Sequence, residues 1–349
     1  MADDDVTRPT GTDAGPATLT DRARTADRAQ ARSAVRGTGG RQRGRTGLTA
    51  PWRKRLEILF FVTPALALFA AFVVVPVLQA IRYSAFRWNG LGPMDQFVGI
   101  ENYLSVLRDD VFTDAVMHNL IIVVLSILIQ LPLGLGIALL LNREMWGKTA
   151  MRIIIFVPYV LAEVVAGVIW LMMLQPNGPA DALLASMGME GLTQLWLGDP
   201  DIALGTVMFV LTWKYLGLAI ILMLAGLQSV PPDLYEAAQI DGASWWQVQR
   251  KITIPLLGPT LRTWAFLSMI GSLQVFDMIW ILTKGGPANS TMTMATYLIN
   301  YGTERGLYGY SSAVAVVLFV ISLAIALVYM RFVLNRDTEP AASKKKVKR

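Results

Sequence analysis

Three ionisable side chains lie inside long apolar stretches of the sequence: Glu163, Lys214 and Asp277. A charge at the centre of a bilayer costs about 2.5–3.5 kcal/mol on insertion scales, so each of these groups is expected to face a protein interior or water. Two interpretations are open. The three groups line a polar path or charge relay through a membrane, or Lys214 forms a structural ion pair with Asp277 or with Glu163.

The chain lacks the residues that most catalytic and metal sites require. It has no cysteine and one histidine, His118, which excludes disulfides, thiolate-bound zinc and clusters of histidine ligands. It has no Gly-x-x-x-x-Gly-Lys-[Ser/Thr] segment that could cradle a nucleotide. No nucleophile can be paired with a general base. We therefore expect no enzyme activity, no metal and no cofactor in this chain.

Long apolar helices must position these residues. The chain is 54% hydrophobic and 16% charged, whereas soluble domains average about 25% charged residues. About 20 helical residues cross a bilayer, and six stretches of that length predict an all-α integral membrane protein with six spans in a domain over 51–335. The predicted spans are about 58–80, 117–141, 153–174, 203–227, 261–283 and 310–334. Residues 1–50 are predicted to be a disordered cytoplasmic tail, and residues 336–349 a basic one.

The basic residues predict the orientation of the spans. Lys and Arg number 25 on the side that holds both tails and the 142–152 and 228–262 loops, against 5 on the opposite side. Cytoplasmic flanks carry the excess of Lys and Arg, so both termini are predicted to be cytoplasmic. The net charge of +6 then belongs to tails lying near anionic headgroups. It does not form a surface for nucleic acid.

The loop at 228–260 is too apolar and too patterned for a flexible linker. Pro231 and Pro232 end the preceding helix, and Asp233 is predicted to cap a new one, with Glu236 three residues later. Gly242 suits the positive φ of a helix C-terminus. Ser244 and Gln247 repeat the capping pattern before a second short helix. The sequence therefore predicts a helix–turn–helix at the cytoplasmic face.

This loop resembles the signature of ABC-importer permeases: Glu-Ala-Ala, three residues, Gly, nine residues, Ile, one residue, an apolar residue and Pro. The positions that match are Glu236, Ala237, Ala238, Gly242, Ile252 and Pro255, and Ile254 stands where the family usually has Leu. The segments Trp213–Gly217, Phe276–Asp277 and Leu282–Pro287 resemble carbohydrate permeases of the maltose and glycerol-phosphate type. The Gly-Gly-Pro ending resembles the first of the two paired permeases.

The resemblance implies a type I ABC importer fold in the bacterial plasma membrane. It implies that the 228–260 loop docks on a separate ATPase subunit, which binds ATP and Mg²⁺. The implied partners are a second homologous permease, two cytoplasmic ATPases and an extracytoplasmic solute-binding protein. The implied function is import of a carbohydrate or related polyol. An ion-coupled secondary transporter and an ABC permease for a non-sugar solute are the alternatives.

The resemblance also points to residues that would line a sugar path. Aromatic rings stack on the C–H faces of sugars, while the sugar hydroxyls need polar partners. The candidates are Trp213, Lys214, Tyr215, Ser268, Ser272, Gln274, Asp277 and Glu163. Ser268 and Ser272 are four residues apart and share one helix face. The alternative role for Trp213 is packing or anchoring at the membrane interface.

Overall fold

The computed structural model describes residues 51–143 and 145–334, so both predicted tails lie outside the described residues. The chain divides into two units, residues 1–70 and residues 71–349. In the first unit the described part is helix α2 (Pro51–Phe69) and the first residue of the π-helix η1 (Ala70–Val74). The remaining helices belong to the second unit.

Within the described residues, the regular structure is helical apart from one isolated bridge between Phe86 and Phe97. This agrees with the predicted all-α class. The helices of the second unit are α3 (Val75–Ser84), α4 (Glu101–Arg108), α5 (Asp110–Leu125), η2 (Ser126–Gln130), α6 (Leu131–Leu141), α7 (Lys148–Val160), α8 (Glu163–Met173), α9 (Pro179–Ser186), η3 (Glu190–Leu192), α10 (Pro200–Gln228), α11 (Pro232–Ile240), α12 (Trp245–Val248), η4 (Gln249–Thr253), α13 (Ile254–Leu256), α14 (Gly258–Leu273), α15 (Asp277–Leu282), α16 (Met294–Tyr297), η5 (Leu298–Thr303) and α17 (Tyr308–Phe332).

Four helical stretches of the described chain are long and apolar enough to cross a membrane: Arg55–Ser84, Asp110–Leu141, Pro200–Gln228 and Tyr308–Phe332. The predicted span 153–174 is instead two helices, α7 and α8, bent by 97° at a short break. The predicted span 261–283 is also divided, because residues 274–276 separate α14 from α15. The number of membrane crossings therefore remains a prediction.

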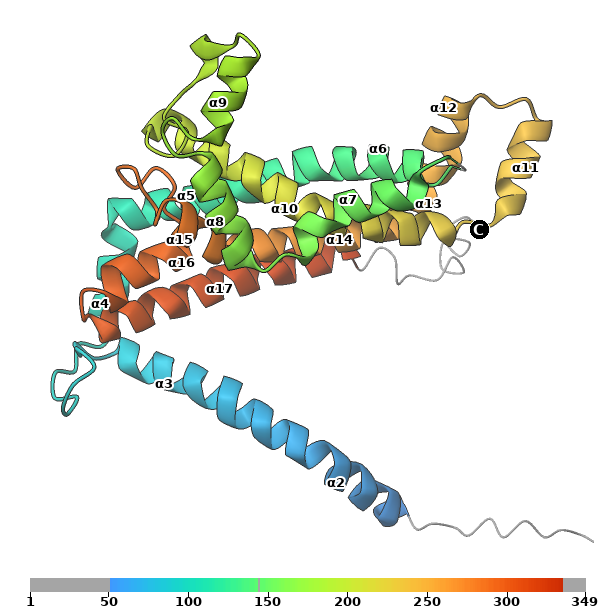
Figure 1. The fold of residues 1–349 in the computed structure, drawn as a ribbon. Coiled ribbons are helices and arrows are strands. Elements are labelled where there is room, and N and C mark those ends of the chain that lie inside the picture. Colours follow the sequence, from blue (N-terminus) through green and yellow to red (C-terminus); the bar gives the residue numbers. More distant parts are fainter. Residues whose placement is uncertain (1–50, 144, 335–349) are drawn as a thin grey trace, which may run out of the picture. The chain divides into compact units, whose positions relative to one another are not determined.

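Helix α10 is the central helix of the second unit and packs against α6, α7 and α14 (Figure 1). Its most apolar window is 56% buried, against at most 22% in the other three candidate spans. Glycines allow this close packing. A Cβ on Gly134 of α6 would lie 2.9 Å from the Cβ of Ala219, and one on Gly217 would lie 2.8 Å from the carbonyl oxygen of Ile155.

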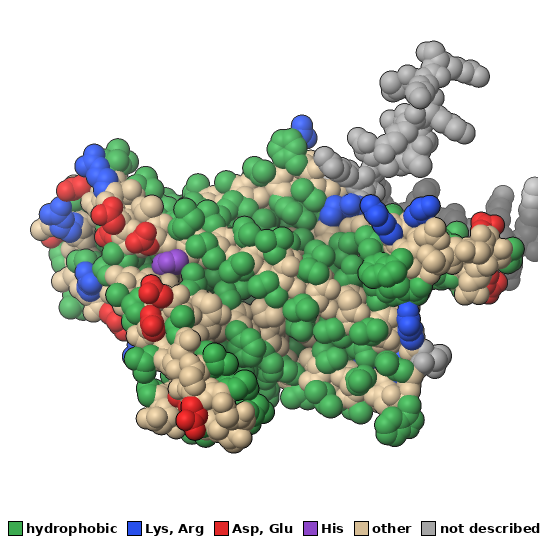
Figure 2. All heavy atoms as spheres, turned by 90° about the horizontal axis from the view of Figure 1, so that it is seen from above, with side chains coloured by type: hydrophobic (Ala, Val, Ile, Leu, Met, Phe, Trp, Pro, Cys, Tyr) green, Lys and Arg blue, Asp and Glu red, His purple; other side chains and the backbone are tan. Residues whose placement is uncertain are grey.

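The two ends of α10 lie at opposite ends of the second unit (Figure 1). Its C-terminus leads into α11 and α12, while its N-terminus lies toward the end that holds α4, α15 and α16. Figure 2 shows hydrophobic side chains over the middle of the visible face and charged side chains gathered toward the ends. This distribution suits a body whose middle lies in lipid.

Candidate functional site

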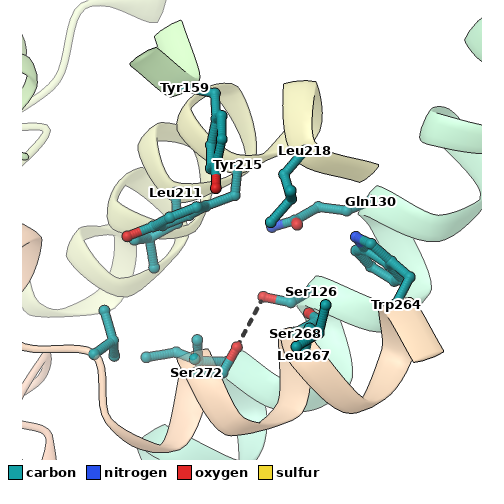
Figure 3. Close-up of a pocket in the computed structure, with 13 residues that line it drawn as sticks. Ser126, Gln130, Tyr159, Leu211, Tyr215, Leu218, Trp264, Leu267, Ser268 and Ser272 are labelled. Atoms are coloured by element: carbon teal, nitrogen blue, oxygen red, sulfur yellow. Dashed lines mark hydrogen bonds between the residues drawn. The ribbon is translucent and has the colours of Figure 1, made fainter. Parts of the chain in front are cut away.

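A cavity of about 170 Å³ lies between the middle of α10 and the helices α5, η2, α7 and α14. Figure 3 shows polar side chains from several of these helices converging on it. The polar side chains of its lining carry hydroxyl, amide or indole groups. They are Ser126, Gln130, Tyr159, Tyr215, Trp264, Ser268 and Ser272. The other lining residues are Ile122, Leu211, Leu218, Leu267, Gly271 and Val275, so no charged side chain lines the cavity.

The π-helix η2 supplies two of the polar groups. It spans Ser126 to Gln130, and both side chains are 3% exposed. Single π-helical turns inside α-helices are frequent at functional sites. The Ser272 hydroxyl of α14 donates to the Ser126 hydroxyl at 3.4 Å, drawn as a dashed line in Figure 3. Ser272 and Ser126 thus face each other across the packed helices α14 and η2.

Three of the eight predicted path residues line this cavity: Tyr215, Ser268 and Ser272. Trp213 does not line it. Its ring packs edge to face against Trp170 of α8, with ring centroids 5.3 Å apart, and it joins the apolar cluster around α8, α10 and α15. In this structure Trp213 is thus packed against α8.

Lys214 is also outside the lining. Its side chain is 1% exposed and reaches the break between α7 and α8. Nζ donates to the carbonyl oxygens of Pro158 at 3.0 Å and Tyr159 at 3.1 Å, and also to that of Leu161. The last four carbonyls of a helix have no partner within it. Lys214 therefore supplies a donor to the unpaired carbonyls at the C-terminus of α7, where the helix dipole also favours a positive charge.

Glu163 is the first residue of α8, where a carboxylate is favoured by the helix dipole. Its Oε1 lies 3.8 Å from Lys214 Nζ and accepts a hydrogen bond of 3.0 Å from the Tyr215 hydroxyl. Of the two ion pairs left open for Lys214, with Asp277 or with Glu163, the structure forms the one with Glu163. Asp277 begins α15 and is exposed, and among the described residues it forms no ion pair; Gln274 is exposed at the end of α14.

Sequence reasoning missed four polar lining residues: Ser126, Gln130, Tyr159 and Trp264. A signal was present for two of them. Ser126 and Gln130 are polar residues four apart in a stretch that is otherwise apolar, so they share one helix face. Tyr159 and Trp264 had no such signal, because an aromatic residue in an apolar stretch is compatible with packing as well as with a cavity wall.

The 228–260 segment forms the predicted pair of short helices, α11 and α12. Ser244 and Gln247 form the predicted capping box, and Gly242 has φ +71°. The predicted capping by Asp233 is wrong: α11 begins at Pro232, so Asp233 lies inside its first turn and Pro231 holds the cap position without a side-chain bond. A proline at the first helical position, such as Pro232, has no backbone N–H that would need a hydrogen-bond partner.

The positions of this segment that match the permease signature are largely exposed. Glu236, Ala237 and Gly242 are exposed, whereas Ala238 is buried. Ile252 lies in η4 and Pro255 in α13. The hydroxyls of Tyr235 and Thr253 lie 3.3 Å apart and connect α11 to η4. The segment therefore forms a projecting helical surface at one end of the second unit (Figure 1).

Residues 130–339 match the family described as the binding-protein-dependent transport system inner membrane component. A probable ABC transporter permease of Pyrococcus horikoshii is 36% identical over 275 residues, 78% of this chain and 94% of the relative. The diacetylchitobiose uptake system permease of Streptomyces coelicolor is 33% identical over 326 residues, 90% of this chain and 91% of the relative. The trehalose/maltose transport system permease of Thermococcus litoralis is 34% identical, covering 77% and 91%.

Solved structures share the fold. A chain of a bacterial ABC transporter involved in the import of the acidic polysaccharide alginate superimposes with a TM-score of 0.72 at 24% identity, over 82% of this chain and 98% of that one. The alginate transporter in complex with its pentasaccharide-bound periplasmic protein gives a TM-score of 0.70 at 24% identity, over 80% and 94%. At this identity the likeness establishes the fold alone.

Proposed function

We propose a specific transport role from one premise: the chain belongs to the family of binding-protein-dependent transport system inner membrane components. It is the transmembrane subunit of an ABC importer that moves a carbohydrate or related polyol. Relatives at 33–34% identity are named as permeases for diacetylchitobiose and for trehalose or maltose. The sequence has no Gly-x-x-x-x-Gly-Lys-[Ser/Thr] segment, which supports a separate ATPase as the source of power for this importer.

One observation carries the solute class. The cavity of about 170 Å³ is lined by aromatic rings, hydroxyls and an amide, and by no charged side chain. Tyr159, Tyr215 and Trp264 offer ring surface for the C–H faces of a sugar, while Ser126, Gln130 and Ser272 offer hydrogen bonds for its hydroxyls. Lys214, which could have favoured an anion, is engaged by the carbonyls of α7 instead. We therefore assign an uncharged, hydroxyl-rich solute to this cavity.

The proposed subunit lies in the bacterial plasma membrane with six crossings and both termini in the cytoplasm. The broken pairs α7–α8 and α14–α15 each count as one crossing. The distribution of Lys and Arg in the flanks supports this orientation. It places α11 and α12 in the cytoplasm and the loops at 81–115, 175–202 and 284–309 on the opposite side.

Four partners complete the importer. A second, homologous permease pairs with this chain in the membrane. Two ATPases dock in the cytoplasm, one of them on the loop surface formed by Glu236, Ala237, Ala238, Gly242, Ile252 and Pro255. These ATPases hold ATP and Mg²⁺. An extracytoplasmic binding protein delivers the solute to the loops on the other side.

Transport follows from binding that differs between two conformations. ATP binding closes the ATPase pair and draws the two docking loops together. The helices move from an inward-facing to an outward-facing arrangement, and the binding protein releases its solute into the cavity beside Tyr215 and Ser272. Hydrolysis returns the importer to its starting state.

The test reconstitutes the complete importer in proteoliposomes, with ATP enclosed in the lumen and the binding protein added outside. Uptake of labelled neutral disaccharides is compared with uptake of glycerol 3-phosphate and glucuronate. We expect ATP-dependent uptake of a neutral sugar that is insensitive to protonophores. Uptake driven by an ion gradient without ATP would overturn the ABC assignment, and preferred uptake of an anion would overturn the solute class.

A further inference from the structure

Two tyrosines of the cavity wall are tied to the ion pair at the break between α7 and α8. Tyr215 lines the cavity from α10, and Tyr159 lines it from the end of α7. The Tyr215 hydroxyl donates to Glu163 Oε1 at 3.0 Å, and the Tyr159 carbonyl oxygen accepts from Lys214 Nζ at 3.1 Å. Figure 3 shows both tyrosine rings on the same side of the cavity, across from the serines of η2 and α14. The ion pair therefore contacts one wall of the cavity from outside its lining.

The hydrogen bond between Tyr215 and Glu163 uses the polar end of both side chains. A tyrosine hydroxyl has one hydrogen to donate, and Tyr215 gives it to the carboxylate. Within the described part of the chain Oε2 of Glu163 is buried without a hydrogen-bond partner, so Tyr215 provides the single hydrogen bond of this carboxylate. Lys214 Nζ lies 3.8 Å from the same Oε1. The cation thus fixes the oxygen atom to which the tyrosine is bound.

Neutralising Lys214 does not by itself account for this arrangement. A carboxylate present only to balance a charge is expected to have both oxygens hydrogen-bonded, because buried polar atoms nearly always are. Glu163 has one such oxygen unpaired among the described residues and directs the other toward a residue of the cavity wall. The tyrosine is therefore the neighbour that this carboxylate is placed to bind.

A ring that is fixed in advance suits a solute that binds by stacking. A side chain that must be immobilised when a ligand binds opposes binding, so a side chain held beforehand increases affinity. Binding sites gain precision when neighbouring hydrogen bonds lock the side chains that contact the ligand. The Tyr215 hydroxyl is bound to Glu163, which leaves the ring as the part of Tyr215 that is offered to a sugar.

We propose that Glu163 is a positioning residue of the solute cavity, whose carboxylate holds the Tyr215 ring in the orientation that receives the sugar. This inference rests on the proposed function, which assigns an uncharged, hydroxyl-rich solute to the cavity. Glu163 does not line the cavity itself and acts through Tyr215. Lys214 supports it by holding both the carboxylate and the backbone of Tyr159.

The test measures equilibrium binding of a labelled sugar to the complete importer in nanodiscs without the binding protein, with and without ATP and vanadate. The probe is the neutral disaccharide that the wild-type importer takes up fastest. Glu163→Leu removes the charge and the acceptor for Tyr215, whereas Glu163→Gln removes the charge and keeps an acceptor of the same size. We expect Kd to rise about three- to tenfold in Glu163→Leu and in Tyr215→Phe. Glu163→Gln should recover most of the affinity that Glu163→Leu loses.

A double variant separates positioning from two independent effects. Glu163 has no hydroxyl to hold once Tyr215 is replaced by Phe, so Glu163→Leu/Tyr215→Phe should bind no more weakly than Tyr215→Phe alone. The unfolding temperature should fall in both Glu163→Leu and Glu163→Gln, because both leave Lys214 without its anion. Affinity and stability therefore separate in Glu163→Gln. Co-purification of the ATPases shows that each variant is assembled, and Tyr215→Phe tests the contact with the ion pair intact.

Four results would overturn the inference. Equal weakening by Glu163→Leu and Glu163→Gln would assign the effect to the charge, and additive losses in the double variant would make Glu163 an independent contact. Wild-type affinity in Tyr215→Phe would show that the hydrogen bond does not position the ring. Uptake of sugar by a wild-type importer that binds no sugar without the binding protein would reject this inference alone. Failure of wild type to take up any neutral sugar would instead reject the proposed function.

Discussion

Lys214 Nζ lies 3.8 Å from Glu163 Oε1, and the same amino group donates to the carbonyls that end α7. One side chain of α10 thus connects the C-terminus of α7 to the N-terminus of α8 at a bend of 97°. The positive charge lies at the C-terminus of α7 and the negative charge at the N-terminus of α8, which are the helix ends where the dipole favours each charge. The geometry explains how two charges are accommodated in an apolar body.

Removing the Lys214 amino group should destabilise the subunit strongly. Lys214→Met leaves the α7 carbonyls without a donor and Glu163 without its cation. Breaking a fully buried pair from one side costs about 3–5 kcal/mol, and the loss here is smaller because the Glu163 side chain is 32% exposed. We expect a clear fall in the thermal unfolding temperature of the purified importer, followed by tryptophan fluorescence. Lys251→Met, at an exposed lysine, is the control and should unfold as wild type does. Equal unfolding temperatures for Lys214→Met and wild type would contradict the structural role.

Polar residues of the cavity should affect the apparent affinity for solute. Gln130→Leu and Ser272→Ala each remove hydrogen-bonding groups from the lining, and a lost hydrogen bond to a sugar costs about 0.5–1.5 kcal/mol. We expect KM for uptake to rise by about two- to tenfold. Ser322→Ala in α17 is the matched control, because Ser322 is buried but lies outside the lining. A rise in KM for Ser322→Ala as large as for Ser272→Ala would show that the effect is not local.

A charge placed in the cavity should suppress uptake of a neutral solute. Ser268→Asp puts a carboxylate where the lining carries no charge, and burial of an unpaired charge is unfavourable. We expect uptake to fall while the ATPase subunits still co-purify. Ser268→Thr keeps the hydroxyl and should retain most uptake. Wild-type transport by Ser268→Asp would exclude this cavity as the solute site.

Position 242 should tolerate residues according to their ability to adopt a positive φ. Gly242 has φ +71°, and an added Cβ would meet no atom within 4 Å. The penalty is therefore backbone strain alone, about 1–2 kcal/mol for most residues. Asn adopts this conformation more readily than Ala, and Val least readily. We expect ATPase co-purification and uptake to decrease in the order Gly242, Gly242→Asn, Gly242→Ala, Gly242→Val; equal activity of all four would exclude a required turn.

Asn119 should be more important for stability than its sequence context suggests. Its amide donates to the carbonyl of Ser272 at 2.8 Å and accepts from the backbone N–H of Met294 at 2.8 Å. Asn119→Leu keeps the size but leaves both buried groups unpaired, at about 1–3 kcal/mol each. We expect a lower unfolding temperature and poorer recovery in detergent. An ionised Asp at position 119 can accept from Met294 but cannot donate to Ser272, so Asn119→Asp shows which of the two hydrogen bonds stabilises the subunit. An unchanged unfolding temperature for Asn119→Leu would contradict the stabilising role of Asn119.

Much of the molecule was predictable from residue order alone. Long apolar runs specify helices wherever backbone hydrogen bonds must be satisfied without water, so 58–80, 117–141 and 203–227 each fall within one helical stretch of the structure. The predicted span 310–334 overlaps the stretch Tyr308–Phe332 and runs past its end. Local signals also placed Gly242 in a helix-ending turn and Ser244 in a capping box. The spacing of Glu236, Gly242 and Pro255 was sufficient to indicate the family.

Tertiary packing decided which polar groups meet. Sequence spacing could not distinguish Lys214 pairing with Glu163 from pairing with Asp277, because the choice depends on where α7 breaks and on which carbonyls that break exposes. Nor could it separate Trp213, which packs on Trp170, from Tyr215, which lines the cavity two residues later. Apolar periodicity is uninformative on a helix that is apolar all round, as α10 is, although only 56% of its apolar window is buried. Only contacts between distant helices assign such residues to a core or to a cavity.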